Sequence, residues 1–99
     1  MTISIYDIIV VVNKTHRNTL AAVLAKPTRD GVRWAAIENL IKALGGEVKE
    51  REGSRVAFKL NGVVSTFHRP HPKPTAKKGA VDAVRVFLRN AGVAENDGI

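Results

Sequence analysis

The 99-residue sequence contains no cysteine. Without thiols the chain can form neither a disulfide framework nor a thiolate-ligated zinc site. A chain without cysteine suits the reducing cytoplasm, which is the location we expect for it. Hydrophobic residues make up 44% of the sequence, as in an ordinary globular protein, so we expect one small domain with one modest core.

Carboxylates are missing from a long stretch in the second half of the sequence, where Glu52 is followed by no acidic residue until Asp82. The basic residues of this stretch are Arg55, Lys59, Arg69, Lys73, Lys77 and Lys78. The whole chain has a formal charge of +7. A positive charge that is local as well as global favours a polyanionic partner over a merely solvated face: nucleic acid first, an acidic protein second and a membrane third.

Long hydrophobic runs are also lacking, so we expect no transmembrane segment. The stretch Ile3–Val12 is apolar but short, is interrupted by Asp7, and lacks the basic region and cleavage site of a signal peptide. Its β-branched part, Ile8–Val12, favours an extended conformation, which leaves an extra strand, an interface strand and a disordered extension open. We expect an N-terminal extension over residues 1–13, one domain over residues 14–93 and a tail over residues 94–99.

Three segments have the apolar spacing of amphipathic helices. The first begins near Asn13 or Thr15, either of which is suited to cap it, and ends before Pro27. The second ends at Gly45–Gly46, because glycine adopts the left-handed C′ conformation without steric cost. The third covers residues 77–90. Their apolar stripes are Leu20, Val23 and Leu24; Trp34, Ile37, Leu40, Ile41 and Leu44; and Val81, Val84, Phe87, Leu88 and Ala91.

Three strands are expected between the second and third helices. Residues 47–51 form a short charged edge strand, and residues 54–60 and 63–68 flank Asn61-Gly62, which supplies the positive φ angles of a type I′ turn. This turn fixes the register, so that Arg55 lies opposite His68. The order α-α-β-β-β-α predicts an α+β fold, in which helices cover one face of a three-stranded antiparallel sheet.

The register also divides the hairpin side chains between the two faces of the sheet. The helix-covered face receives Val56, Phe58, Leu60, Val63 and Phe67. The open face receives Arg55, Ala57, Lys59, Val64, Thr66 and His68.

Three stretches, taken in order, carry a family resemblance: "IENLIKALGGEV", "REGSRVAF" and "FHRPHPKPTAKKGAVDAVRVFLRNAGV" together resemble the HicA toxins. "IENLIKALGGEV" is similar to the helix that ends in glycine before the first strand, and "REGSRVAF" is similar to the family's Gly-Ser-His segment. "FHRPHPKPTAKKGAVDAVRVFLRNAGV" is similar to the closing part, in which Pro and His end the last strand and Lys-Gly opens the last helix. The resemblance covers about residues 17–93 and implies a fold like the double-stranded RNA-binding domain.

The resemblance also implies a function. HicA toxins cleave mRNA without a metal ion, and a HicB-type antitoxin silences them, so no cofactor is expected. The free chain should be a monomer and the inhibited chain part of a hetero-oligomer with the antitoxin. In the family the histidine of Gly-Ser-His is catalytic, whereas this sequence has Arg55 at that position.

Metal-free RNA cleavage needs groups that transfer protons and a cation that stabilises the phosphorane. Histidine suits proton transfer because its pKa lies near 7, while arginine stays protonated and binds phosphate through its planar fork. We therefore predict His68 as general acid or base, Arg55 as phosphate ligand and His71 as a second imidazole. Candidate RNA contacts are Lys59, Arg69, Lys73, Lys77 and Lys78.

Other interpretations stay open. His68 and Arg55 can equally form a basic surface patch, so a non-catalytic module that binds RNA or an antitoxin is the alternative to an endoribonuclease. An interaction adaptor that uses the N-terminal stretch is a third hypothesis. No metal site is expected, because His68 and His71 lack a third nearby ligand and Arg69 lies between them. The sequence has no P-loop, nucleophile elbow or HExxH motif.

Overall fold

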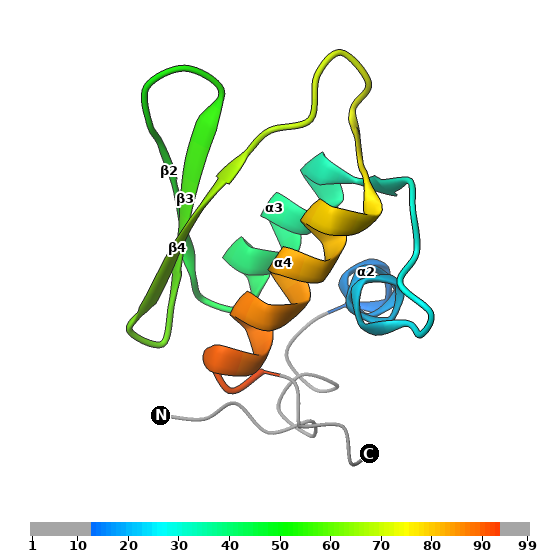
Figure 1. Ribbon diagram of the computed structural model, residues 1–99. Helices are drawn as coiled ribbons and strands as arrows, with labels where there is room; N and C mark the ends of the chain where they lie inside the picture. Colours follow the sequence, from blue (N-terminus) through cyan, green and yellow to red (C-terminus); the bar gives the residue numbers. More distant parts are fainter. Residues whose placement is uncertain (1–12, 94–99) are drawn as a thin grey trace.

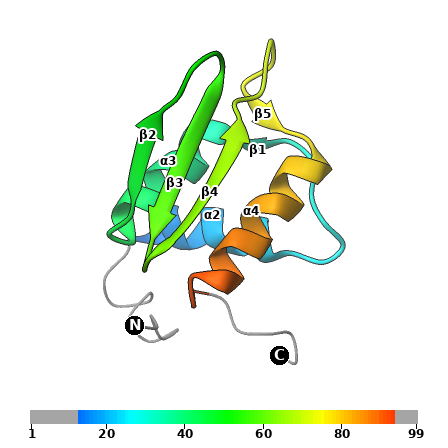
Figure 2. The same cartoon turned by 60° about the vertical axis from the view of Figure 1, so that its left-hand side comes forward.

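The computed structural model describes residues 13–93, which form three layers (Figure 1). The strands β2 (Glu47–Glu50), β3 (Arg55–Leu60) and β4 (Val63–His68) make an antiparallel sheet in that order, with β3 in the centre. Helices α3 (Trp34–Ala43) and α4 (Lys78–Asn90) cover one face, and α2 (Lys14–Leu24) packs behind them, away from the sheet. The other face is open, as Figure 2 shows.

This architecture confirms the predicted α+β fold with the order α-α-β-β-β-α and one covered sheet face. The expected strand and helix bounds agree with the observed ones to within one or two residues. The strand suggested within Ile3–Val12 lies outside the described residues.

One element was not predicted: a second, two-stranded sheet. β1 (Val32–Arg33) pairs antiparallel with β5 (Thr75–Ala76), so that Val32 lies opposite Ala76 and Arg33 opposite Thr75. The pairing is extended by hydrogen bonds from the Gly31 amide to the Ala76 carbonyl and from the Trp34 amide to the Pro74 carbonyl. It ties the segment before α3 to the segment before α4.

The helix ends follow local sequence signals. Asn13 caps α2, because its side-chain oxygen accepts a hydrogen bond from the His16 amide at 3.0 Å. At the end of α3, Gly45 has a φ of 91° and donates to Lys42, and Gly46 donates to Ile41, the two bonds of a Schellman motif. A Cβ added to Gly46 would lie 2.7 Å from the Lys59 carbonyl oxygen, so this position needs glycine for the close approach of β3.

Four aromatic rings form the centre of the core between the sheet and the helices. Trp34 stacks on Phe58 at 5.6 Å between ring centroids, and Phe58 lies 4.8 Å from Phe67. Phe87 of α4 contacts both phenylalanines edge-on. Trp34 is 4% exposed, so the predicted apolar stripe of α3 is confirmed and this tryptophan is no stacking platform for a nucleobase.

Arg85 is a buried basic residue that fastens α2 to α4. Its guanidinium donates to the carbonyls of Val23 and Ala25 and to the Thr28 hydroxyl, and forms an ion pair with Asp82 at 3.2 Å. A cation at the C-terminal end of α2 satisfies carbonyls that the helix itself leaves free and complements the helix dipole. Arg85 therefore serves the fold rather than the basic surface.

Candidate functional site

The β3–β4 hairpin has the predicted register. Leu60 pairs with Val63, and the ladder continues until Arg55 lies opposite His68. Asn61 and Gly62 both have positive φ angles, 51° and 82°, as a type I′ turn requires.

Arg55 and His68 lie close together across the two strands. The Arg69 amide donates to the Ser54 carbonyl at 2.8 Å, one position beyond this pair. Because hydrogen-bonded and non-hydrogen-bonded pairs alternate along an antiparallel ladder, Arg55 and His68 form a non-hydrogen-bonded pair, the class whose Cα atoms are only about 4.5 Å apart. Both side chains are exposed on the open face of the sheet.

His68 also borders a hollow of about 580 Å³ at the end of β4. The walls come from the end of β4, the proline-rich loop after it, β5, the start of α4 and the loop before β1. They consist of Asp30, Gly31, His68, Arg69, Pro70, His71, Pro72, Lys73, Thr75, Ala76, Lys77 and Ala80. We call this hollow the histidine pocket. It brings together both predicted imidazoles and three of the predicted RNA contacts, Arg69, Lys73 and Lys77.

The loop that carries His71 is fixed at both of its ends. On the β5 side, the Trp34 amide bonds to Pro74 at 3.0 Å and β1 pairs with β5. On the β4 side, the backbone bond between Arg69 and Ser54 and the side chain of Arg69 hold it. Prolines at positions 70, 72 and 74 further restrict the backbone between these anchors. The pocket wall is thus built from an anchored loop.

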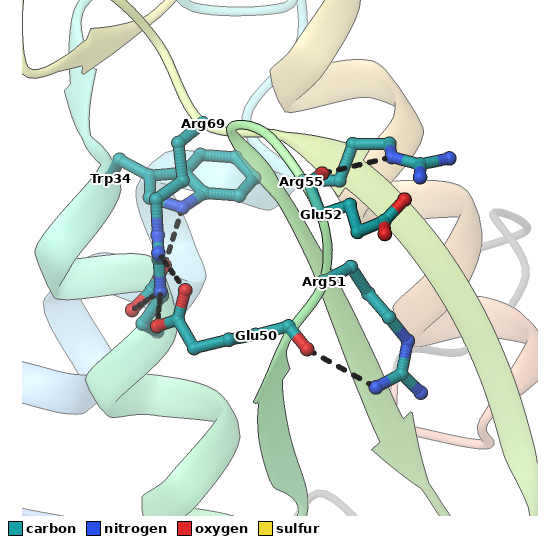
Figure 3. Close-up of polar contacts among 7 residues, drawn as sticks. Trp34, Glu50, Arg51, Glu52, Arg55 and Arg69 are labelled. Atoms are coloured by element: carbon teal, nitrogen blue, oxygen red, sulfur yellow. Dashed lines mark hydrogen bonds and ion pairs between the residues drawn. The ribbon is translucent and has the colours of Figure 1, made fainter.

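Arg69 forms two ion pairs that join α3, β2 and the end of β4 (Figure 3). Its Nε donates to Glu38 at 2.8 Å, and its two terminal nitrogens reach Glu50 at 2.6 and 2.8 Å. Glu38 also accepts from the Trp34 indole nitrogen at 2.7 Å. The hydrogen bonds that Arg69 donates to Glu50 lower the pKa of Glu50, and those that it donates to Glu50 and Glu38 raise the pKa of Arg69. We call these four residues the arginine clamp.

The clamp engages the guanidinium of Arg69, which the sequence suggested as an RNA contact. The guanidinium donates four side-chain hydrogen bonds to two carboxylates. A phosphate would have to displace these carboxylates to bind Arg69. Glu38 and Glu50 lie 31 and 19 residues from Arg69 in the chain, so no local sequence pattern predicts either ion pair. We leave Arg69 out of the RNA contacts proposed below.

Arg55 and Lys59 lie on the open sheet face and do not line the histidine pocket. The Arg55 Nε donates to the Glu52 carbonyl at 3.2 Å, which directs its side chain along the β2–β3 turn (Figure 3). Lys59 lies between Glu47 and Val64 in the ladder. Lys78, at the start of α4, is exposed and does not line the pocket either. Apart from Lys78, the predicted residues therefore divide between two adjacent surfaces that share His68.

Asp30 is a pocket residue that sequence reasoning missed. It lies in the loop before β1 and reaches the pocket because β1 pairs with β5, a pairing without a sequence signal of its own. Within residues 13–93 no group of three histidine, aspartate or glutamate side chains is placed to hold a metal ion. None of the helices in this part of the chain has the length and apolarity needed to cross a bilayer.

The fold and the site define a small basic α+β protein that resembles the double-stranded RNA-binding domain in its order of elements. The family model described as "HicA toxin of bacterial toxin-antitoxin" matches residues 34–93, from the first residue of α3 to the end of the described chain. The chain therefore belongs to the HicA toxin family and is the toxin of a toxin–antitoxin system, with an antitoxin as its partner. Comparisons with curated proteins and with solved structures gave no match.

Proposed function

We propose that this toxin is a metal-independent endoribonuclease that cleaves mRNA in the histidine pocket. The observation that carries the proposal is that His68 and His71 line one hollow together with Lys73 and Lys77, in a chain of the HicA family. Two imidazoles can exchange protons near neutral pH, and two ammonium groups can hold an anionic backbone.

The reaction would use the 2′-hydroxyl of the RNA as its nucleophile. One imidazole accepts the 2′-hydroxyl proton while the 2′-oxygen–phosphorus bond forms. The other donates a proton to the 5′-oxygen as the phosphorus–5′-oxygen bond breaks, which leaves a 2′,3′-cyclic phosphate and a 5′-hydroxyl end. No oxidant, reductant or metal is needed, because the lysines supply the charge that stabilises the phosphorane.

Arg55 would act next to the pocket as a phosphate ligand. Its cross-strand partner is His68, and only its Nε is bonded to Glu52, so the terminal guanidinium nitrogens remain for an anion. Lys59 on the open face and Lys78 at the start of α4 would hold RNA on either side. Phosphate contacts of this kind give strong salt dependence and weak sequence preference.

A HicB-type antitoxin would cover the open sheet face and with it His68. This face combines Arg55, Lys49 and Lys59 with one carboxylate, Glu47, which forms an ion pair with Lys49 at 3.4 Å. It also carries Val64, which is 56% exposed. An apolar residue within a basic surround suits a protein partner with an acidic contact surface. Replacing Lys59 by glutamate should slow association with the antitoxin, whereas Lys14→Glu on α2 should not.

RNA cleavage by the purified toxin in EDTA tests the proposal. His68→Ala and His71→Ala should each lower the cleavage rate by about 100- to 10,000-fold, the range for removal of a general acid or base. Arg55→Ala should lower it less and weaken binding. His16→Ala is the matched control, because this remaining histidine of the chain lies on α2 outside the pocket.

Wild-type protein that binds RNA or antitoxin without cutting would reject the enzyme in favour of the non-catalytic binding module. Cleavage that only His71→Ala abolishes would place the proton transfer in the loop and remove His68 from the mechanism.

A further inference from the structure

A second, shallower hollow adjoins the histidine pocket. It has a volume of about 240 Å³ and lies between α2, the loop before β1 and the start of α3. Asp30 and Gly31 line both hollows. On the far side of this shared border lie Arg29 and Arg33, together with Asn18 and Thr19 of α2. We call the second hollow the arginine groove.

The two arginines of the groove differ from Arg69 and Arg85. Arg69 and Arg85 use their guanidinium groups in internal ion pairs. Within residues 13–93, Arg29 and Arg33 are exposed, and neither forms a side-chain hydrogen bond or an ion pair. Their guanidinium groups therefore remain available to an anion from outside.

The border between the hollows is low and fixed in place. Gly31 has a φ of 85°, carries no side chain, and has open space where a Cβ would be. Its amide donates to the Ala76 carbonyl, and β1 pairs with β5 directly beyond it. The small two-stranded sheet is thus a shared wall: Thr75 and Ala76 line the pocket, while Val32 and Arg33 line the groove.

We propose that the pocket and the groove form one continuous track for single-stranded RNA, in which Arg29 and Arg33 bind backbone phosphates beyond the cleavage position. The proposal rests on RNA being the substrate of the histidine pocket. It adds a binding site on the helix side of the molecule, remote from the open sheet face. Planar guanidinium groups bind phosphate bidentately, which suits this role.

The groove fits a nucleic acid better than a protein. Among the described residues the exposed large hydrophobic side chains are Val64 and Val86, and neither lines the groove. A protein interface normally has an apolar centre of large side chains, whereas the apolar residues that line the groove are the small or half-buried Ala22, Val32 and Ala36. Its cations and polar side chains match a phosphate backbone instead.

The proposal also predicts that a substitution of Asp30 strengthens RNA binding, the opposite of the effect expected for the arginines. Its carboxylate borders both hollows, where a phosphate backbone would pass. Like charges repel, so the wild-type residue should weaken the binding of RNA that crosses the border. Asp30→Asn should therefore tighten the binding of long RNA and leave short RNA that occupies the pocket alone less affected.

The test uses full-length toxin and fluorescent 2′-O-methyl RNA, which cannot be cleaved because its 2′-oxygen is blocked. Oligonucleotides of about four and about twelve nucleotides span the usual range of single-strand sites. Binding is followed by anisotropy over a series of salt concentrations for wild type, Arg29→Gln/Arg33→Gln and Asp30→Asn. Lys42→Gln/Arg51→Gln is the matched control, since it removes the same charge from the end of α3 and from the β2–β3 turn.

The arginine double variant should weaken binding of the long RNA by roughly two- to tenfold per residue. It should lower the salt slope by about 0.7 for each lost phosphate contact. Short RNA should bind as before, which also shows that the variant is folded.

If the arginine and control variants lose the same affinity for long RNA, or neither loses any, the groove is not an RNA site. The pocket would remain one. A selective loss of antitoxin binding would instead assign the groove to the protein partner. If wild-type toxin binds no RNA, the proposed function fails together with this inference.

Discussion

The arginine clamp makes a quantitative prediction about stability. Arg69→Gln removes the charge that holds Glu38 of α3 and Glu50 of β2 to the end of β4. The Glu38 side chain is only 16% exposed and that of Arg69 is 32% exposed, so loss of the arginine leaves a largely covered carboxylate with one remaining donor, the Trp34 indole. Glu50 is 73% exposed and can return to water at little cost.

The interaction between Arg69 and Glu38 therefore determines how much stability Arg69→Gln loses. Hydrogen bonds to a charged group contribute about 1.5–3 kcal/mol, and partial exposure places this pair near the lower end, at about 2 kcal/mol. For a domain of this size, such a loss lowers Tm by roughly 8–16 °C. Glu38→Gln should cost less, because the amide oxygen can still accept from Trp34.

Urea unfolding followed by the fluorescence of Trp34, the single tryptophan, measures these changes directly. A double-mutant cycle of Arg69→Gln and Glu38→Gln isolates the pair, and Arg51→Gln is the control on the neighbouring turn, with an expected change within about 0.5 kcal/mol. Additive effects in the cycle, within about 0.5 kcal/mol, would refute the reasoning that Arg69 and Glu38 stabilise each other.

Three further predictions concern the same framework. Gly46→Ala should destabilise the fold by about 1–3 kcal/mol in urea unfolding, because its Cβ meets the Lys59 carbonyl at 2.7 Å, and a cost near zero would show that β3 can shift freely. Asn61→Gly keeps the turn but loses the hydrogen bond to the Ala91 carbonyl at 2.7 Å, so it should lower the free energy of unfolding by about 1 kcal/mol. An Asn61→Asp variant as stable as wild type would show that this bond does not stabilise the fold. The pKa of Glu50 is lowered in the folded state, so its contribution to stability is complete above the unfolded-state pKa of about 4.3 and is lost as the pH falls below it; Glu50→Gln should flatten this part of the pH–stability curve.

Local signals were sufficient to predict the sheet and the helices that cover it. Asn61-Gly62 determines a turn type, the turn determines a register, and the register places Arg55 opposite His68. The stripe of α3 has the period of a helix and ends at a glycine pair, so its buried face follows from the sequence alone. In each case the pattern and the structure it specifies lie within a few residues of one another.

The histidine pocket was less predictable because contacts between distant segments build it. β1 and β5 are two residues long and show no period, yet their pairing carries Asp30 and Gly31 to the pocket. From the sequence alone, every arginine is also expected to contribute to the surface charge. In the folded chain, Arg69 and Arg85 instead bind carboxylates and carbonyls that are distant in the sequence. The basic surface is therefore smaller than the composition indicates.

Arg55, at the position where the resemblance to HicA toxins implies a histidine, leads to the most direct test of the site. If His68 has taken over the proton transfer from the neighbouring strand, an imidazole at either position should reach the same phosphate, because cross-strand Cβ atoms lie only about 4.5–5.5 Å apart. His68→Ala should then be inactive, and His68→Ala/Arg55→His should regain part of the cleavage rate. Rescue must fail in His71→Ala/Arg55→His, since the loop imidazole lies beyond the strand. A dead His68→Ala/Arg55→His protein that still binds RNA normally would mean that the two positions are not interchangeable, and that His68 does not occupy the role of the family's histidine.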